Sequence, residues 1–260
     1  MSLKLVSLAS GSKGNCTLVL SDTTAILVDA GISFARLTRE LRPFGLTPSK
    51  IDGVVITHEH TDHVCGLPRL CACAPVYAHP YTAAAISRRQ GGLCNYVEQE
   101  FYDGGFTVGD IDVIPFRVPH DAVYPMGYTF RVQGGAQVSV ATDMGKPTVG
   151  VFNNIKESEV VLLEANHDVD MLKSGPYPEN LKRRILGDTG HLSNDMSAVF
   201  AERLIGSAVK TILLGHLSQQ NNLPELATGT VKGRLLQRGC CDIAVDVALQ
   251  DCASEVFEVK

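Results

Sequence analysis

Short hydrophobic runs separated by turn residues mark the beginning of the chain. We expect strands at residues 3–8, 17–20 and 25–28, with turns rich in Gly, Ser, Asn and Asp between them. Runs this short, bounded by such turns, are typical of antiparallel hairpins. A helix is predicted over residues 34–44, because three arginines recur there on the outer face and Gly45 follows as a stop signal.

The strand-like pattern returns along the rest of the chain, interrupted by helical segments. Further strands are expected at residues 53–56, 75–78, 106–108, 112–116, 128–132, 137–141, 160–164, 211–214, 242–248 and 256–259, and helices at 65–73, 81–89, 194–205 and 225–237. Residues 91–125 as a whole should carry short strands. No composition break or low-complexity linker divides the sequence. We therefore expect one α/β domain, residues 1–260, with two strand-rich halves.

Composition and charge narrow the class of protein. Of the 260 residues, 45% are hydrophobic and 20% are charged, which is ordinary for a globular chain able to bury a large core. The formal net charge of −5 argues against a broadly basic nucleic-acid binder, so any such contact would need local basic patches and metal ions. The eight cysteines include no C-x-x-C pair, residues 1–6 lead into no long apolar stretch, and no run elsewhere approaches transmembrane length. We expect a cytoplasmic protein with free thiols.

The candidate chemistry concentrates in His58-Glu59-His60-Thr61-Asp62-His63, which follows the apolar run at residues 53–56. A strand ending there would deliver three imidazoles and a carboxylate into one small volume at the carboxyl edge of a sheet. These groups together suit zinc, iron or manganese. A solvated turn is the alternative interpretation, but four potential ligands within six positions are hard to obtain from one. We expect Glu59 and Thr61 to point away.

Later strands also end in possible ligands or acid–base groups. These are His120, Asp143, His167 and His216. With the motif they suffice for two metals, one held by His58, His60 and His120, the other by Asp62, His63 and His216, and both bridged by Asp143. Two metals clamp the attacking and leaving oxygens of a displacement and generate a hydroxide near neutral pH. Asp188 is a second candidate for the bridge, but it lies in a loop rather than at a strand end.

The order HxHxDH, His, Asp, His, each at a strand end, resembles the metallo-β-lactamase fold hydrolases. This resemblance implies an α/β, four-layer αββα sandwich of two mixed sheets flanked by helices, with a dinuclear site at one edge. Five segments are similar to the YycJ (WalJ) branch of that family: residues 9–16, 29–31, 163–168, 187–194 and 214–218. The branch implies a 5′→3′ exonuclease acting on double-stranded DNA, without a separate cap domain.

Acid–base and substrate roles are assigned around this centre. Asp62 would ligate one metal and orient or deprotonate the nucleophile. His191 could protonate the leaving oxygen or bind a phosphate, with His167 as the second candidate and Asp188 as a possible partner of His191. The alternatives are that the turn at His191 only caps the next helix, and that His167 only orients a ligand.

Substrate contacts are expected from the Gly/Ser loop near the N-terminus and from two later turns. The candidates are Ser10, Ser12, Asn15, Asn166, His167 and Ser193. A tight hairpin turn explains the first loop equally well. Candidate DNA-backbone contacts are Arg88-Arg89, residues 182–184 and the set Lys232, Arg234 and Arg238, although such clusters are usually solvated surface. His79 is expected to be structural.

The function expected from these residues is that of a dinuclear metal phosphodiesterase, with a metal-bridging hydroxide attacking phosphorus in DNA. One alternative is a small-molecule hydrolase acting on a cyclic phosphodiester, thioester or lactam at the same site. Another is a non-catalytic scaffold, against which the intact ligand set speaks. Histidine and aspartate ligands accommodate zinc, manganese or iron, so the sequence leaves the metal open.

Overall fold

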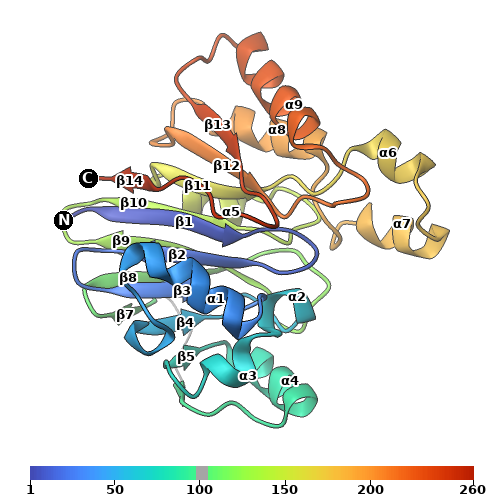
Figure 1. The fold of residues 1–260 in the computed structure, drawn as a ribbon. Helices are drawn as coiled ribbons and strands as arrows, with labels where there is room; N and C mark the ends of the chain where they lie inside the picture. Colours follow the sequence, from blue (N-terminus) through green and yellow to red (C-terminus); the bar gives the residue numbers. More distant parts are fainter. Residues whose placement is uncertain (98–104) are drawn as a thin grey trace.

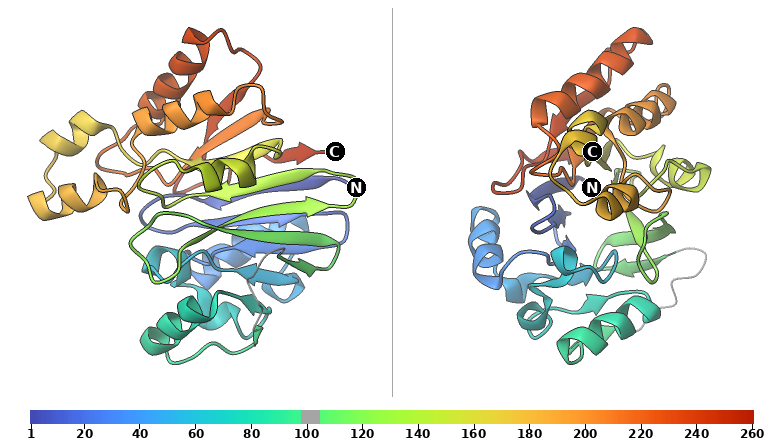
Figure 2. Two further views of the ribbon diagram at one scale, coloured as in Figure 1. Left: turned by 180° about the vertical axis from the view of Figure 1, so that it is seen from behind. Right: turned by 90° about the vertical axis from the view of Figure 1, so that its right-hand side faces the viewer.

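The structure, a computed structural model, describes residues 1–97 and 105–260. Within these residues two seven-stranded sheets lie face to face, with helices on both outer sides (Figures 1 and 2). The expected four-layer αββα sandwich is therefore confirmed. Of the segment 91–125, for which short strands are expected, residues 98–104 lie outside the described part.

The first sheet comes from the N-terminal part of the chain and is completed by the last strand. Its strands, in spatial order, are β14 (Phe257–Val259), β1 (Leu3–Ala9), β2 (Cys16–Leu20), β3 (Ala25–Val28), β4 (Gly53–Val55), β5 (Val76–Tyr77) and β6 (Tyr96–Val97). The first three strands of the chain form the expected antiparallel hairpins, whereas β3 to β6 run parallel. The helical segments of this half are α1 (Phe34–Leu41), η1 (Arg42–Phe44), η2 (Pro48–Lys50), α2 (Thr61–Val64), α3 (Leu67–Leu70) and α4 (Pro80–Gln90).

The second sheet comes from the rest of the chain. Its strands, in spatial order, are β13 (Ala244–Val247), β12 (Thr211–Gly215), β11 (Val160–Glu164), β10 (Gln137–Ala141), β9 (Met126–Val132), β8 (Ile111–Arg117) and β7 (Phe106–Val108). The helices α5 (Val149–Ile155), α8 (Asn194–Arg203) and α9 (Pro224–Gln237) cover its outer side. The helices α6 (Val169–Ser174) and α7 (Glu179–Ile185) instead project from one end of the molecule (Figures 1 and 2).

Apolar side chains fill three layers, one between the sheets and one under the helices on each side. In β1, Leu3 and Leu5 face the other sheet, while Val6 and Leu8 pack in the layer under the helices. Successive side chains of a strand point to opposite faces, and here both faces are covered. This is why the strands appear in the sequence as continuous apolar runs rather than as alternating ones.

Strand direction places the candidate chemistry at one edge of the sandwich. β10, β11, β12 and β13 pair in parallel, and two antiparallel pairings through β9 make β8 parallel to β10. The residues that follow β8, β10, β11 and β12 therefore emerge at the same end of the second sheet. The loop after β4 meets them there, and the backbone N–H of Met126, at the start of β9, donates to Thr57 in that loop at 3.0 Å.

Several helices differ from the expected ones. The helix predicted over residues 34–44 changes to the 3₁₀ segment η1 after Leu41, and Pro43 within η1 lacks the N–H that an α-helix would use. The segment 65–73 contains only the short α3. The helices α5, α6 and α7 were not predicted, because six or seven residues are too few for helical periodicity to stand out.

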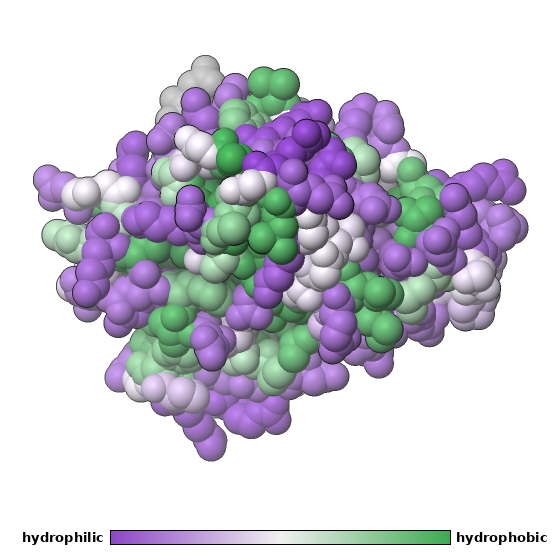
Figure 3. Space-filling view, turned by 90° about the horizontal axis from the view of Figure 1, so that it is seen from above, coloured by the Kyte–Doolittle hydropathy of each residue, from purple (hydrophilic) through white to green (hydrophobic). Residues whose placement is uncertain are grey.

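The surface of the described residues has a mixed character. Every helix in this part of the chain is too short or too polar to cross a bilayer. Some large apolar side chains are exposed on α9, including Leu226 and Leu236. The view onto the top of the molecule shows hydrophobic residues interspersed with hydrophilic ones (Figure 3). All eight cysteines are free thiols.

Candidate metal centre and substrate pocket

The motif leaves β4 and turns directly into the short helix α2. His60 is the residue before the helix, and Asp62 and His63 lie within it. Gly31 makes this turn possible, because a Cβ at that position would lie 1.6 Å from the carbonyl oxygen of Asp62. Asn15 fastens the same carbonyl from the N-terminal loop with its backbone N–H at 2.8 Å. Asn15 and Gly31 belong to two of the segments that resemble the YycJ (WalJ) branch. Both segments thus hold the turn that carries the histidine–aspartate motif.

The first cluster consists of His58, His60 and His120. The Nδ1 atom of His60 lies 3.0 Å from His58 Nε2 and 3.3 Å from His120 Nε2. Burial lowers the pKa of all three imidazoles, which favours the neutral form that ligates metals. His120 Nδ1 donates to the carbonyl oxygen of Gly190 at 3.0 Å, so its Nε2 faces the cluster.

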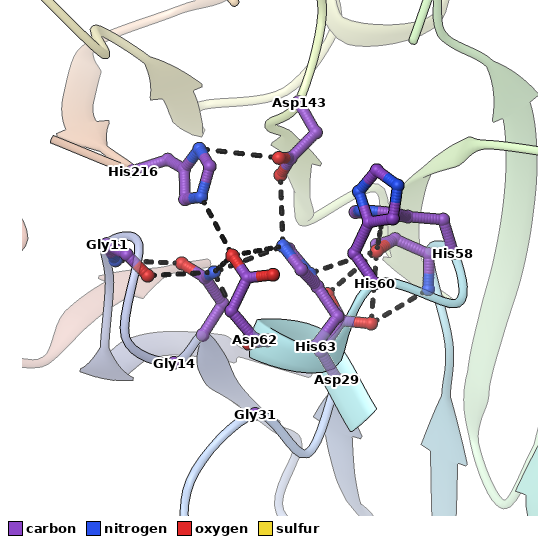
Figure 4. Close-up of polar contacts among 12 residues, drawn as sticks. Gly11, Gly14, Asp29, Gly31, His58, His60, Asp62, His63, Asp143 and His216 are labelled. Carbon is purple, nitrogen blue, oxygen red and sulfur yellow. Dashed lines mark hydrogen bonds and ion pairs between the residues drawn. The ribbon is translucent and has the colours of Figure 1, made fainter. Parts of the chain in front are cut away.

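The second cluster consists of Asp62, His63 and His216. Asp62 Oδ2 lies 3.5 Å from His63 Nε2 and 3.3 Å from His216 Nε2 (Figure 4). Burial alone would lower the pKa of both histidines, but surrounding carboxylates, Asp143 first among them, outweigh it. They raise the pKa of His63 well above its usual value and that of His216 to about 10. The same concentration of negative charge favours a metal cation.

Asp143 lies between the two clusters. Its carboxylate oxygens are 3.4 Å from His63 Nε2, 3.3 Å from His216 Nδ1 and 3.9 Å from His120 Nε2. The Oδ2 atom is buried and accepts no hydrogen bond from the residues that the structure describes. A buried carboxylate oxygen without a donor is costly unless a cation neutralises it. The donor set therefore fits a bridging position between metals.

The alternative bridge, Asp188, lies elsewhere. Its side chain is 79% exposed and forms an ion pair with Lys146 Nζ at 2.6 Å. It contacts neither cluster among the described residues, and it does not orient His191.

Glu164, at the end of β11, was not assigned a role from the sequence. Its side chain is fully buried, and its Oε1 accepts from His191 Nδ1 at 2.7 Å and from His216 Nδ1 at 3.0 Å. Its Oε2 accepts from the backbone N–H of Met144 at 2.7 Å. Burial opposes ionisation, but His191 and His216 outweigh it and hold the pKa of Glu164 below its usual value. Glu164, rather than Asp188, is thus the partner of His191.

Asp29 plays the matching part in the first sheet and was also not singled out. Its Oδ2 accepts from His63 Nδ1 at 2.7 Å, and its Oδ1 accepts from the backbone N–H of Thr57 at 2.8 Å. Asp29, Asp143 and His216 all have positive φ angles, of 63°, 57° and 56°. Such backbone geometry is uncommon for residues other than glycine and gathers at functional sites.

Glu59 is a further correction. It was expected to be a spectator on the turn, but it is only 4% exposed, and its Oε1 accepts from the backbone N–H of Val123 at 3.0 Å. It therefore fixes the loop that follows His120. Thr61 is exposed and lines the pocket described below.

The two surplus histidines have different surroundings. His191 is partly exposed and lines the pocket beside the clusters, with Nδ1 held by Glu164. His167 is 1% exposed, and neither of its ring nitrogens has a hydrogen-bond partner among the described residues. Burial lowers its pKa to about 4, so it is a poor proton donor at neutral pH. His79 is the N-cap of α4 and stacks on Tyr124, with ring centroids 3.4 Å apart.

The expected substrate-contact residues separate into two groups. Ser12 and Asn166 line the pocket. Ser10, Asn15 and Ser193 are buried and have structural partners.

Each of these three partners can be named. Ser10 Oγ accepts from the backbone N–H of His216 at 2.7 Å. Asn15 Nδ2 donates to the carbonyl oxygen of Gly11 at 3.1 Å. Ser193 caps α8, accepting from Met196 at 3.2 Å. These hydrogen bonds indicate that the three residues stabilise the site, and their burial leaves them little surface for contact with a substrate.

The candidate basic contacts divide in the same way. Arg89 and Arg184 line the pocket. Arg88 and Arg183 are exposed. Lys182 Nζ instead donates to the carbonyl oxygen of Lys173 at 2.7 Å. The set of Lys232, Arg234 and Arg238, on α9 and at its C-cap, does not line the pocket, and Arg234 and Arg238 both pair with Glu202.

A pocket of about 360 Å³ opens over the two clusters. Ligand candidates line one part of it, namely His60, Asp62, Asp143 and His216. The volume is at the lower end of the range for small-molecule sites, and the pocket places polar groups beside a metal-binding constellation. Such an arrangement can bind the anionic group of a substrate at the metal position, while the rest of the substrate lies along the pocket walls.

The fold and the histidine–aspartate clusters together indicate divalent metal binding. A family model described as a β-lactamase superfamily domain matches residues 24–216. The chain therefore belongs to the metallo-β-lactamase fold superfamily, as the motif order implied. A solved structure with the same fold is the metallo-β-lactamase fold protein YhfI from Bacillus subtilis, with a TM-score of 0.73 and 18% identity over the full length of both chains.

Two curated relatives narrow the branch. The chain is 37% identical to exodeoxyribonuclease WalJ of Streptococcus pneumoniae serotype 2 over 253 residues, which is 95% of this chain and 93% of the relative. It is 38% identical to exodeoxyribonuclease YycJ of Bacillus anthracis over 242 residues, which is 92% of this chain and 91% of the relative. The expected resemblance to the YycJ (WalJ) branch is confirmed.

Proposed function

We propose that this protein is a dinuclear metal-dependent phosphodiesterase that degrades double-stranded DNA from the 5′ end. The observation that carries the proposal is the convergence of two clusters on Asp143, whose buried Oδ2 accepts no hydrogen bond among the described residues. Relatives named exodeoxyribonucleases, matched over more than nine-tenths of the chain, support DNA as the substrate. A DNA substrate and free thiols fit the cytoplasm as the compartment.

The two clusters would hold one metal each. His58, His60 and His120 would hold the first, and Asp62, His63 and His216 the second, with Asp143 between them. Two divalent ions held there would supply a nucleophile at neutral pH and would offset charge on the phosphate oxygens. Zinc, manganese and iron all accept such ligands.

The chain's own residues provide orientation and proton transfer. Asp62 reaches both His63 and His216 and is partly exposed at the pocket, so it can orient or deprotonate the attacking water. His191 Nδ1–H donates to Glu164, which leaves Nε2 as the atom that can pass a proton to the leaving oxygen. The complete ligand set supports a catalytic role rather than that of a scaffold.

Replacing Asp62 tests the proposal most directly. We expect Asp62→Ala to lose cleavage of a labelled 5′-phosphorylated duplex, by about 10⁴-fold or more, since the change removes a candidate metal ligand and the group beside the nucleophile. The assay resolves polarity on duplexes labelled at either end, with zinc and manganese supplied separately.

Asp188→Ala is the matched control, because it removes an exposed aspartate outside both clusters and should leave cleavage unchanged. Wild-type cleavage that persists in Asp62→Ala would exclude Asp62 from the reaction. An absence of cleavage by the wild-type protein with either metal, alongside turnover of a small phosphodiester, would move the proposal to the small-molecule alternative.

His191→Asn tests the proton donor. We expect the rate on DNA to fall about 100-fold, because the leaving oxygen of a deoxyribose needs a proton. Turnover of bis-p-nitrophenyl phosphate should fall less than about fivefold, since p-nitrophenolate leaves without one. Bound metal, measured by elemental analysis, should stay at the wild-type level. An equal loss on both substrates would contradict the role of proton donor.

A further inference from the structure

The helices α6 and α7, with the segment between them, form an arm over residues 169–187. The arm projects from one end of the molecule (Figures 1 and 2), and its residues line the same pocket as the clusters. Within it, Lys182 Nζ donates to the carbonyl oxygen of Lys173 at 2.7 Å, which links α7 to α6. The arm is therefore held together by its own contacts and does not belong to either sheet.

The inner end of the arm is attached to the metal centre. Arg184 donates to Asp121, the residue after His120, and its Nη2 lies 3.0 Å from Asp121 Oδ1. The backbone N–H of His191 donates to the carbonyl oxygen of Ile185 at 2.9 Å. Gly190 allows this approach, because a Cβ there would lie 2.2 Å from the same carbonyl. The position of α7 is thus set by Asp121, which is next to the ligand candidate His120, and by His191.

The arm gives the pocket an apolar wall. Tyr177, Leu181 and Ile185 line the same pocket as Asp62 and Asp143. Tyr177 is half-buried, and it has no hydrogen bond or ring contact with any residue that the structure describes. Its ring lines a pocket that also holds a highly polar centre. A substrate with a flat apolar part next to its anionic group would cover it.

We propose that Tyr177, supported by Leu181 and Ile185, is a stacking platform for a nucleobase that flanks the scissile phosphate. Every base offers a π-face, so stacking on an aromatic ring binds single nucleotides without selecting a sequence. This is the property that a processive or non-specific exonuclease requires. The inference rests on the proposed function and adds to it the residue that receives a base.

The test combines two protein variants with duplexes that lack one base. Tyr177→Ala and Tyr177→Phe are compared on an intact 5′-phosphorylated duplex and on duplexes abasic at the first or the second nucleotide. Binding is measured by fluorescence anisotropy on the same duplexes carrying cleavage-resistant phosphorothioate linkages at the 5′ end. We expect Tyr177→Ala to raise Kd and lower kcat/KM about tenfold on the intact duplex. On the duplex abasic at the stacked position the loss should be less than about twofold, and Tyr177→Phe should resemble the wild type.

Tyr81→Ala is the matched control, since Tyr81 is 63% exposed on α4 and does not line the pocket. The platform is excluded if Tyr177→Ala loses nothing, or loses equally on the intact duplex and on both abasic duplexes. If the wild type cleaves no duplex but the base-dependent change in Kd persists, the nuclease proposal fails and the platform stands. If the wild type binds no duplex, both fail.

Discussion

The two sheets contribute to the centre in different ways. The first sheet supplies four ligand candidates from a single turn after β4, whereas the second supplies His120, Asp143 and His216 from three separate strand ends. Each sheet also places one buried carboxylate behind a histidine. Among the histidines of the described residues, Asp29 contacts His63, whereas Glu164 contacts both His216 and His191. The first carboxylate can therefore affect only the metal clusters, while the second connects a cluster to the candidate proton donor.

Glu164→Gln should have the larger effect of the two. The amide cannot offset charge on His216 or His191, so we expect kcat/KM on duplex DNA to fall about 1000-fold, through weaker metal binding and a misplaced proton donor. The decisive measurement is the double variant with His191→Asn. Because both changes disturb one unit, the second should add less than about threefold. If the losses of the two single variants multiplied fully in the double variant, Glu164 and His191 would act independently.

Asp29→Asn should affect metal binding alone. Asparagine can still accept from Thr57, but it no longer provides the charge beside His63, so we expect metal affinity to fall about 10- to 100-fold. At saturating metal kcat should return to within about threefold of the wild type, because His191 is untouched. Activity is measured against metal concentration for both carboxylate variants. If kcat of Asp29→Asn stayed low at saturating metal, Asp29 would affect more than metal binding, and the proposed difference between the two carboxylates would be wrong.

The smallest effect is expected at the arginines that line the pocket. Arg184, from the second half, is engaged by Asp121, while Arg89 on α4 makes a long contact, 3.4 Å to the carbonyl oxygen of Glu59. Arg89 is thus the better candidate for a DNA phosphate. We expect Arg89→Gln to weaken duplex binding modestly and to reduce the slope of log Kd against log salt by about one. Arg238→Gln, which changes an arginine paired with Glu202, should leave the slope unchanged.

The metal clusters could be predicted from the sequence because their residues follow apolar runs. A ligand at the end of each buried strand is a local pattern, and the strands themselves were correct within a few residues. The partners of the histidines were harder to predict. Glu164 lies 27 positions before His191 and 52 before His216, and it ends an apolar strand like an ordinary boundary residue. The burial of Ser193 and His167 was hard to predict for a similar reason, since a turn sequence does not show which side chains it buries.

The sequence by itself determined the strand-rich sandwich, the histidine–aspartate motif and the branch of the family. The strands and the motif depend on periodicity and on residues close together in the chain, whereas the sandwich and the branch follow from the resemblance of the motifs to a known family. Only the tertiary structure decided which carboxylate orients which histidine, and which wall of the pocket is apolar. Those relations follow from the parallel pairing of β10, β11 and β12 and from the attachment of the arm near Gly190. Neighbours across strands are set by the pairing of the whole sheet, and no local pattern specifies them.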